Sequence, residues 1–125
     1  MKRLATVFSA AAMALVAAHA CAFAQFGSKP AKIIFPFAAG GSGDAIARLI
    51  ADKLQQATGQ PVIVENRTGA SGRLGVVAVK QAEPDGTTIL MSPFTLMLIY
   101  PHIYPQLNYD PDADFAPVSQ VASFE

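Results

Sequence analysis

The feature that most constrains the fold of this chain is a regular alternation of short apolar runs with longer amphipathic segments. Three runs are rich in β-branched or aromatic side chains, which is typical of buried strands: residues 32–37, 61–66 and 87–92. Between these runs, residues 45–59 carry apolar side chains at helical spacing, and residues 73–83 are also expected to form a helix. Strands that alternate with helices predict an α/β fold with a parallel sheet and right-handed crossovers.

The ends of the two predicted helices carry local signals. Gly59 is placed to end the first helix in a left-handed conformation. Ser42 and Ser71 are candidates for the N-cap residues of the two helices, because a serine oxygen can accept a hydrogen bond from a free backbone N–H.

The pattern changes after Phe94. Residues 100–117 contain four prolines and three aspartates, and proline at this density is expected to exclude regular helix and central strand. We therefore expect a long irregular segment, followed by a fourth strand at residues 118–124.

The first 24 residues have the features of a cleavable export signal. Lys2 and Arg3 precede an uncharged apolar core at residues 4–18, and Ala22-Phe23-Ala24 predicts cleavage before Gln25. The alternatives are an uncleaved membrane anchor and a lipoprotein that uses Cys21. The alanine-rich core and the lack of a leucine just before the cysteine favour cleavage.

Composition excludes several function classes for the remainder, residues 25–125. This part keeps seven basic and nine acidic residues and has no cysteine, so its charge is slightly negative. A nucleic-acid partner is not expected, because such proteins carry a basic patch. A disulfide framework and a cysteine-based metal cluster are excluded for the same segment.

The glycine-rich turn after the first predicted strand is the strongest candidate for a binding site. It reads Phe37-Ala38-Ala39-Gly40-Gly41-Ser42-Gly43-Asp44. In open parallel sheets, ligands bind beyond the carboxyl ends of the strands, and the N–H groups of a following helix can bind a carboxylate. The aspartate is expected in the first helical turn, where it favours the helix but repels an anion. A purely structural turn, with glycines that allow tight packing, remains the alternative.

Other motifs are incomplete. Gly41-Ser42-Gly43 with Glu65 resembles a dinucleotide fingerprint, but Ile46 stands where the third glycine or alanine belongs. Residues 110–121 begin like a calcium loop but lack its glycine and its final glutamate. Ser42 and Ser92 have no visible histidine partner in chain order, so a hydrolase triad is not indicated. The residues therefore predict no catalytic group, no metal site and no cofactor.

Four blocks of the sequence resemble one known family, the Bug-type periplasmic receptors of tripartite tricarboxylate transporters. The blocks are KIIFPFAAGGSGDAIAR at 32–48, GQPVIVENRTGASGRLG at 59–75, PDGTTIL at 84–90 and YPHIYPQLNYDPDADFAPVS at 100–119. The chain departs from the usual family pattern at Gly43, Thr68, Ser71 and Thr87, and the first of these lies in the candidate loop.

The resemblance implies a type II periplasmic-binding-protein (Venus-flytrap) fold. Residues 1–24 would be the signal peptide, and residues 25–125 the N-terminal part of lobe 1, so that the parallel-sheet lobe is incomplete in this chain. It implies a non-enzymatic periplasmic receptor that captures a small carboxylate or related organic solute. The receptor would deliver that solute to the membrane subunits of the transporter.

The resemblance also implies the ligand-binding residues, which are carried over by position. The family binds its ligands largely through backbone groups and bridging waters at the first and second strand-to-helix loops. The first loop supplies Phe37, Ala38, Ala39, Gly40, Gly41, Ser42 and Asp44. Ser92 and Pro93, after the third strand, would lie near the same site. The alternative function is an exported α/β enzyme or ligand-sensing domain, because one scaffold hosts many functions.

Overall fold

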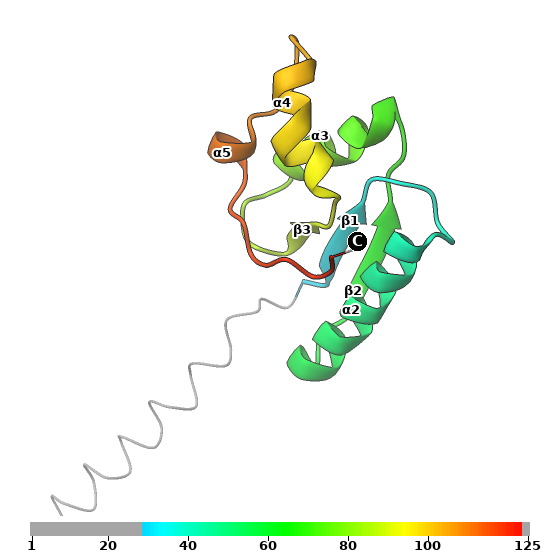
Figure 1. The fold of residues 1–125 in the computed structure, drawn as a ribbon. Coiled ribbons are helices and arrows are strands. Elements are labelled where there is room, and N and C mark those ends of the chain that lie inside the picture. Colours follow the sequence, from blue (N-terminus) through cyan, green and yellow to red (C-terminus); the bar gives the residue numbers. More distant parts are fainter. Residues whose placement is uncertain (1–28, 124–125) are drawn as a thin grey trace, which may run out of the picture.

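The computed structural model describes residues 29–123 of the chain, and the predicted signal peptide lies outside the described residues (Figure 1). The first part contains strand β1 (Ala31–Phe35), helix α2 (Ser42–Thr58) and strand β2 (Val62–Asn66). A short 3₁₀ turn, η2 (Ala70–Gly72), leads into helix α3 (Arg73–Lys80) and strand β3 (Thr88–Leu90). The predicted alternation of strands and helices is thus confirmed.

The three strands form one parallel sheet in the order β2-β1-β3, so β1 is the central strand. Ile33 of β1 is opposite Val64 of β2 and Ile89 of β3. The chain therefore moves from β1 to one neighbour and then crosses to the other side of β1. Crossovers of the same hand in opposite directions place the two connecting helices on opposite faces of the sheet.

One helix lies on each face of the sheet (Figure 1). Helix α2 packs on β1 and β2, where the alternate side chains Ile33 and Phe35 meet Ala47 and Ala51 in one buried cluster. Helix α3 packs on β1 and β3. Alternation along β1 supplies apolar side chains to both faces, as a buried parallel strand requires.

Helix α2 ends as predicted but begins differently. Gly59 adopts the left-handed conformation, and its N–H donates to the Gln55 carbonyl oxygen at 2.9 Å. At the other end, Gly41 is the N-cap and Ser42 is the first helical residue, so Ser42 does not cap the helix. The N-cap of α3 is likewise Gly72, and Ser71 lies one residue earlier with positive φ.

The expectation of a wholly irregular segment after Phe94 was wrong. A π-helical turn, η3 (Thr95–Ile99), continues into α4 (Tyr100–Ile103), and a separate single turn forms α5 (Pro111–Asp114). Pro111 lies in the first turn of α5, where the missing N–H has no intrahelical partner to lose. Pro101 lies directly after the π-helical turn, inside the continuous segment formed by η3 and α4.

The predicted fourth strand is also not formed, because residues 115–123 are not helical or extended in a ladder in the described structure. Val118 is 87% exposed and pairs with no sheet edge. An apolar run becomes a strand only where it pairs with another strand, and the sequence pattern alone does not show that pairing.

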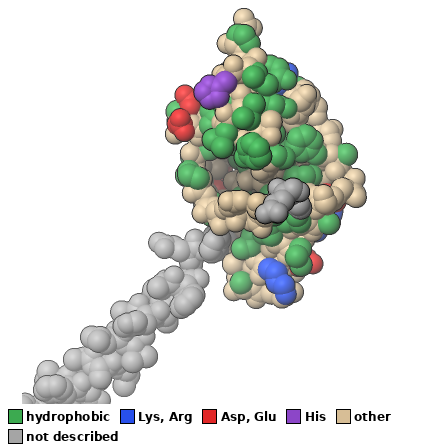
Figure 2. Space-filling view, viewed as in Figure 1, with side chains coloured by type: hydrophobic (Ala, Val, Ile, Leu, Met, Phe, Trp, Pro, Cys, Tyr) green, Lys and Arg blue, Asp and Glu red, His purple; other side chains and the backbone are tan. Residues whose placement is uncertain are grey.

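The segment after β3 builds a second buried cluster. Its centre consists of Val76 of α3, Leu96 of η3 and Tyr109, whose hydroxyl donates to the Leu96 carbonyl oxygen at 2.5 Å. Apolar side chains also gather on the outside of η3 and α4 (Figure 2). The exposed ones there are Phe94, Leu98, Ile99 and Ile103.

Candidate functional site

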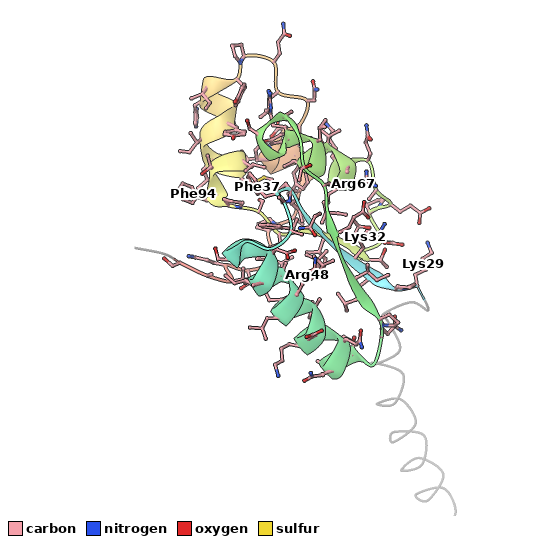
Figure 3. All side chains as sticks on the ribbon, turned by 90° about the vertical axis from the view of Figure 1, so that its right-hand side faces the viewer. Lys29, Lys32, Phe37, Arg48, Arg67 and Phe94 are labelled. Carbon is pink, nitrogen blue, oxygen red and sulfur yellow. The ribbon has the colours of Figure 1, made fainter. Side chains whose placement is uncertain are left out.

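The carboxyl ends of all three strands meet at one edge of the sheet, and the predicted loops follow them there. In Figure 3, Phe37 lies beyond one end of β1, whereas Lys29 and Lys32 lie at the other end. The Arg67 N–H donates to the Phe35 carbonyl oxygen at 2.9 Å, and the Met91 N–H donates to the Ile34 carbonyl oxygen at 3.0 Å. These bonds hold the starts of the second and third loops against the end of the central strand.

The strand order creates a topological switch point between the carboxyl ends of β1 and β3. The chain connects β1 to β2 on one side and then continues on the other side of β1, so the order reverses between β1 and β3. In open α/β sheets, ligands bind in the crevice at such a topological switch point. The loop after β1, residues 36–41, and the turn after β3, residues 91–93, flank this point.

The first loop is open to solvent and leads directly into the free end of α2. Ala38, Ala39, Gly40, Gly41 and Ser42 are all exposed. The first intrahelical hydrogen bond runs from the Ala45 N–H to the Gly41 carbonyl oxygen at 3.0 Å. The N–H groups of residues 42–44 therefore precede the helical ladder and have no helical acceptor. No side chain caps them.

These amide groups give the loop the chemistry of an anion site. They lie at the positive end of the dipole of a helix of 17 residues. The Ser42 side chain is exposed, and its hydroxyl makes no hydrogen bond to any of the described residues. One exposed helix end therefore offers both backbone and hydroxyl donors to a ligand.

Asp44 is buried beneath the loop, with 4% of its surface exposed, and it does not face the solvent as a free anion. Its Oδ2 accepts hydrogen bonds from the Gly40 N–H and from Arg48 Nε, each at 3.0 Å. Its Oδ1 accepts from Arg48 Nη2 at 3.1 Å and from Asn66 Nδ2 at 2.9 Å. The predicted repulsion of an anion is thus offset, because a guanidinium neutralises the carboxylate.

The same contacts explain the acidity of this carboxyl group. Hydrogen bonds from Arg48, from the Gly40 N–H and from Asn66 stabilise the charged form and lower the pKa of Asp44 from 3.8 to about 2. The group is therefore ionised throughout the physiological pH range.

Phe37 is half-buried, and its ring packs in the protein rather than into the loop's open space. It contacts both buried clusters, and its centroid is 5.8 Å from that of Phe35. Its carbonyl oxygen accepts a hydrogen bond from Asn66 Nδ2 at 3.1 Å. Phe37 therefore anchors the start of the loop, and the residues after it are more exposed.

Ser92 and Pro93 lie at the same edge as the first loop, as expected for the turn after β3. Ser92 is half-buried and Pro93 is exposed. The Pro93 carbonyl oxygen accepts from the Leu96 N–H at 3.3 Å, which joins this turn to η3. The structure thus brings both predicted loops to the switch point, but it records no hydrogen bond between them.

The second loop is more constrained than its sequence suggested. Four consecutive residues have positive φ, namely Gly69, Ala70, Ser71 and Gly72. Two of the four are not glycine, which is uncommon and stores strain. The Ser71 and Ala70 carbonyl oxygens are held by the Tyr100 hydroxyl at 3.2 Å and by Arg73 Nε at 2.9 Å.

Arg48 and Asn66 were missed as site residues by sequence reasoning. Arg48 carried a readable signal, because it follows Asp44 by four residues on the same helix face. Asn66 carried none, since only the pairing of β2 with β1 brings it to the loop.

Gly43 has a packing reason to be glycine. A Cβ placed on it would lie 2.5 Å from Cζ of the buried Phe35 ring, which is closer than side chains approach one another. In this chain, the Phe35 ring occupies the space that a side chain at position 43 would need.

Two cavities outline the surface, and the first loop lines neither. One of about 400 Å³ lies at the amino ends of the strands between Lys29, Lys32 and Glu83. The other, of about 500 Å³, lies between Asn66, Arg67 and α3. The loop's own residues 38–42 are exposed to solvent.

Comparison with known proteins identifies relatives. Residues 46–125 match the profile of the tripartite tricarboxylate transporter family receptor. The protein BugT of Bordetella pertussis is 40% identical over 95 residues, which is 75% of this chain and 29% of BugT. The chain thus spans less than a third of the length of this relative.

Two solved structures share the fold. The structure of R. palustris Rpa4515 with adipate has a TM-score of 0.70 and 32% identity, covering 74% of this chain and 31% of that one. The structure of MatC from Rhodopseudomonas palustris with bound malate has a TM-score of 0.63 and 36% identity, with the same coverage. In the part of the chain that the structure describes, no helix has the length and apolar character needed to span a bilayer.

Proposed function

Since this chain belongs to the family of tripartite tricarboxylate transporter receptors, we propose that it forms the first part of a periplasmic receptor for a small organic carboxylate. The observation that supports this most strongly is the free amino end of α2 at the switch point between β1 and β3. A carboxylate there accepts two or three charge-assisted hydrogen bonds from the N–H groups of residues 42–44, without a cationic side chain.

The substrate class is proposed from the same geometry and from the relatives. Backbone amides recognise a carboxylate group and leave the rest of the molecule unspecified. The two similar structures that hold adipate and malate support a dicarboxylate. Ser42 adds a hydroxyl donor beside the amides, and Ser92 and Pro93 form the facing turn.

The proposed setting is the periplasm. Residues 1–24 would be removed on export, so N-terminal sequencing of the exported protein should begin at Gln25. Residues 25–125 would form the N-terminal part of lobe 1. The intact receptor would deliver its solute to the membrane subunits of a tripartite transporter. The first loop would bind the solute and have no catalytic role.

The test is calorimetric titration of the intact protein with succinate, malate and adipate. Gly41→Val should abolish binding, because its side chain would crowd the adjacent amides. The variant should fold, since Gly41 has an ordinary φ of −84° and, apart from its two chain neighbours, nothing lies within 4 Å of a Cβ placed there.

Ala57→Val is the matched control, because Ala57 is exposed near the other end of the same helix. It should leave the affinity unchanged. If the folded Gly41→Val protein binds a dicarboxylate as tightly as the wild type, the ligand site lies elsewhere.

A further inference from the structure

The first loop is held at both of its ends by a small polar network beneath it. Asp44 is the one charged residue that is buried in the described part of the chain. It binds the Gly40 N–H, at the end of the loop, at 3.0 Å. Asn66 binds the Phe37 carbonyl oxygen, at the start of the loop, at 3.1 Å.

The network closes on itself through Arg48. Asn66 Nδ2 donates to Asp44 Oδ1 at 2.9 Å, and Asn66 Oδ1 accepts from Arg48 Nη2 at 3.2 Å. Arg48 in turn donates hydrogen bonds to both carboxylate oxygens of Asp44. The four donors on the carboxylate occupy its acceptor positions, so Asp44 has little capacity left for a ligand.

The network joins three separate pieces of the chain. Asp44 and Arg48 belong to α2, Asn66 is the last residue of β2, and the bound backbone groups belong to the loop after β1. Only Ala38 and Ala39 lie between the Phe37 carbonyl oxygen and the Gly40 N–H, which the network binds, and both alanines are exposed. The loop is therefore short and fixed at both ends.

We propose that Asp44 and Asn66 are positioning residues, which fix the loop so that the free amides of α2 face the ligand without touching the ligand themselves. This inference rests on the proposed carboxylate site. The positioning role also explains why Asp44, a negatively charged residue, lies at the helix end where an anionic ligand is proposed to bind. The Asp44 charge is compensated by Arg48, and its position orders the backbone on which the ligand depends. An ordered loop binds more tightly because less conformational entropy is lost on binding.

The test uses two substitutions that preserve side-chain shape in the intact protein. Asp44→Asn places an NH₂ group against donors, and Asn66→Leu removes both donors that Asn66 supplies without adding a charge beside the proposed anion site. Each should weaken succinate binding about tenfold or more, which is the change expected from about 1.4 kcal/mol of lost preorganisation.

A second readout needs no ligand. In Asp44→Ala, the exchange rate of the Gly40 amide proton measured by NMR should rise about tenfold, because its acceptor is lost. The Gly59 amide, which binds the Gln55 carbonyl oxygen, is the internal control and should not change.

Leu54→Ala is the control for stability. Leu54 packs against the buried cluster beneath α2, ten residues after Asp44. Its side chain is apolar and is not part of the polar network. It should lower the melting temperature and leave the affinity unchanged. Arg48→Lys keeps the charge at an exposed position, and it serves as the network variant if the two shape-preserving variants do not fold.

The outcomes are distinguishable. Unchanged affinity in the network variants, or an equal loss of affinity in Leu54→Ala, would overturn the positioning role. An unchanged Gly40 amide would overturn it as well. If the wild type binds no dicarboxylate, the proposed function fails, and the Gly40 amide still decides whether the network holds the loop.

Discussion

Substituting Gly72 tests how the second loop is packed against the first. Gly72 has φ of +91° and is buried, and a Cβ on it would lie 3.0 Å from Leu96 Cδ2 and 3.2 Å from Phe37 Cζ. The left-handed conformation costs an alanine about 1–2 kcal/mol. Overpacking a buried site adds about 1–3 kcal/mol. Gly72→Ala should therefore lower the free energy of unfolding by about 2–5 kcal/mol.

Gly59→Ala is the matched control, because Gly59 is also left-handed, with φ of +71°, but nothing lies within 4 Å of its added Cβ. It should cost only the conformational term, about 1–2 kcal/mol. Urea unfolding of both variants of the intact protein measures the difference. Equal losses at the two positions would refute the claim that the loop is tightly packed over Phe37 and Leu96.

Three further predictions follow from the first loop. Ser42→Ala should weaken carboxylate binding by about 1 kcal/mol in calorimetry, and it should leave the melting temperature unchanged because Ser42 caps nothing. Gly43→Ala should lower the free energy of unfolding by about 1–2 kcal/mol, as overpacking against Phe35 outweighs the gain in helix propensity, and Phe35→Leu should reduce that loss in a double-mutant cycle. Because the pKa of Asp44 is lowered to about 2, the stability that its carboxylate contributes should be fully present above pH 3.8 and lost as the pH falls toward 2, which acid titration of unfolding in wild type and Asp44→Asn would show.

The sequence was sufficient to predict the three strands of the sheet, the two main helices and the end of α2 at Gly59. These elements are determined locally, by hydrophobic spacing and by the conformational freedom of glycine. The position of the loop beyond a strand's carboxyl end followed from the parallel sheet. The order β2-β1-β3 could not be predicted, because it depends on which strand pairs with β1 on each side.

Proline was weighed too strongly in the segment after Phe94. Pro101 lies within the helical segment formed by η3 and α4, directly after the π-helical turn. Pro111 lies where α5 begins, and Asp110 caps that helix by accepting from the N–H groups of Asp112 and Ala113. That aspartate followed by proline was a readable start signal. The role of Asn66 was not readable, since a contact across 22 residues exists only in the folded chain.

The most direct test of the proposed binding site is a crystal structure of the intact protein with the dicarboxylate that binds it most tightly. We expect one carboxylate of the ligand to lie about 2.7–2.9 Å from backbone nitrogens of residues 42–44. The Asp44 carboxylate should still bind Gly40 and Arg48 in that complex. A ligand carboxylate held instead by Lys29 or Lys32 at the opposite edge of the sheet, with the first loop unoccupied, would contradict the account.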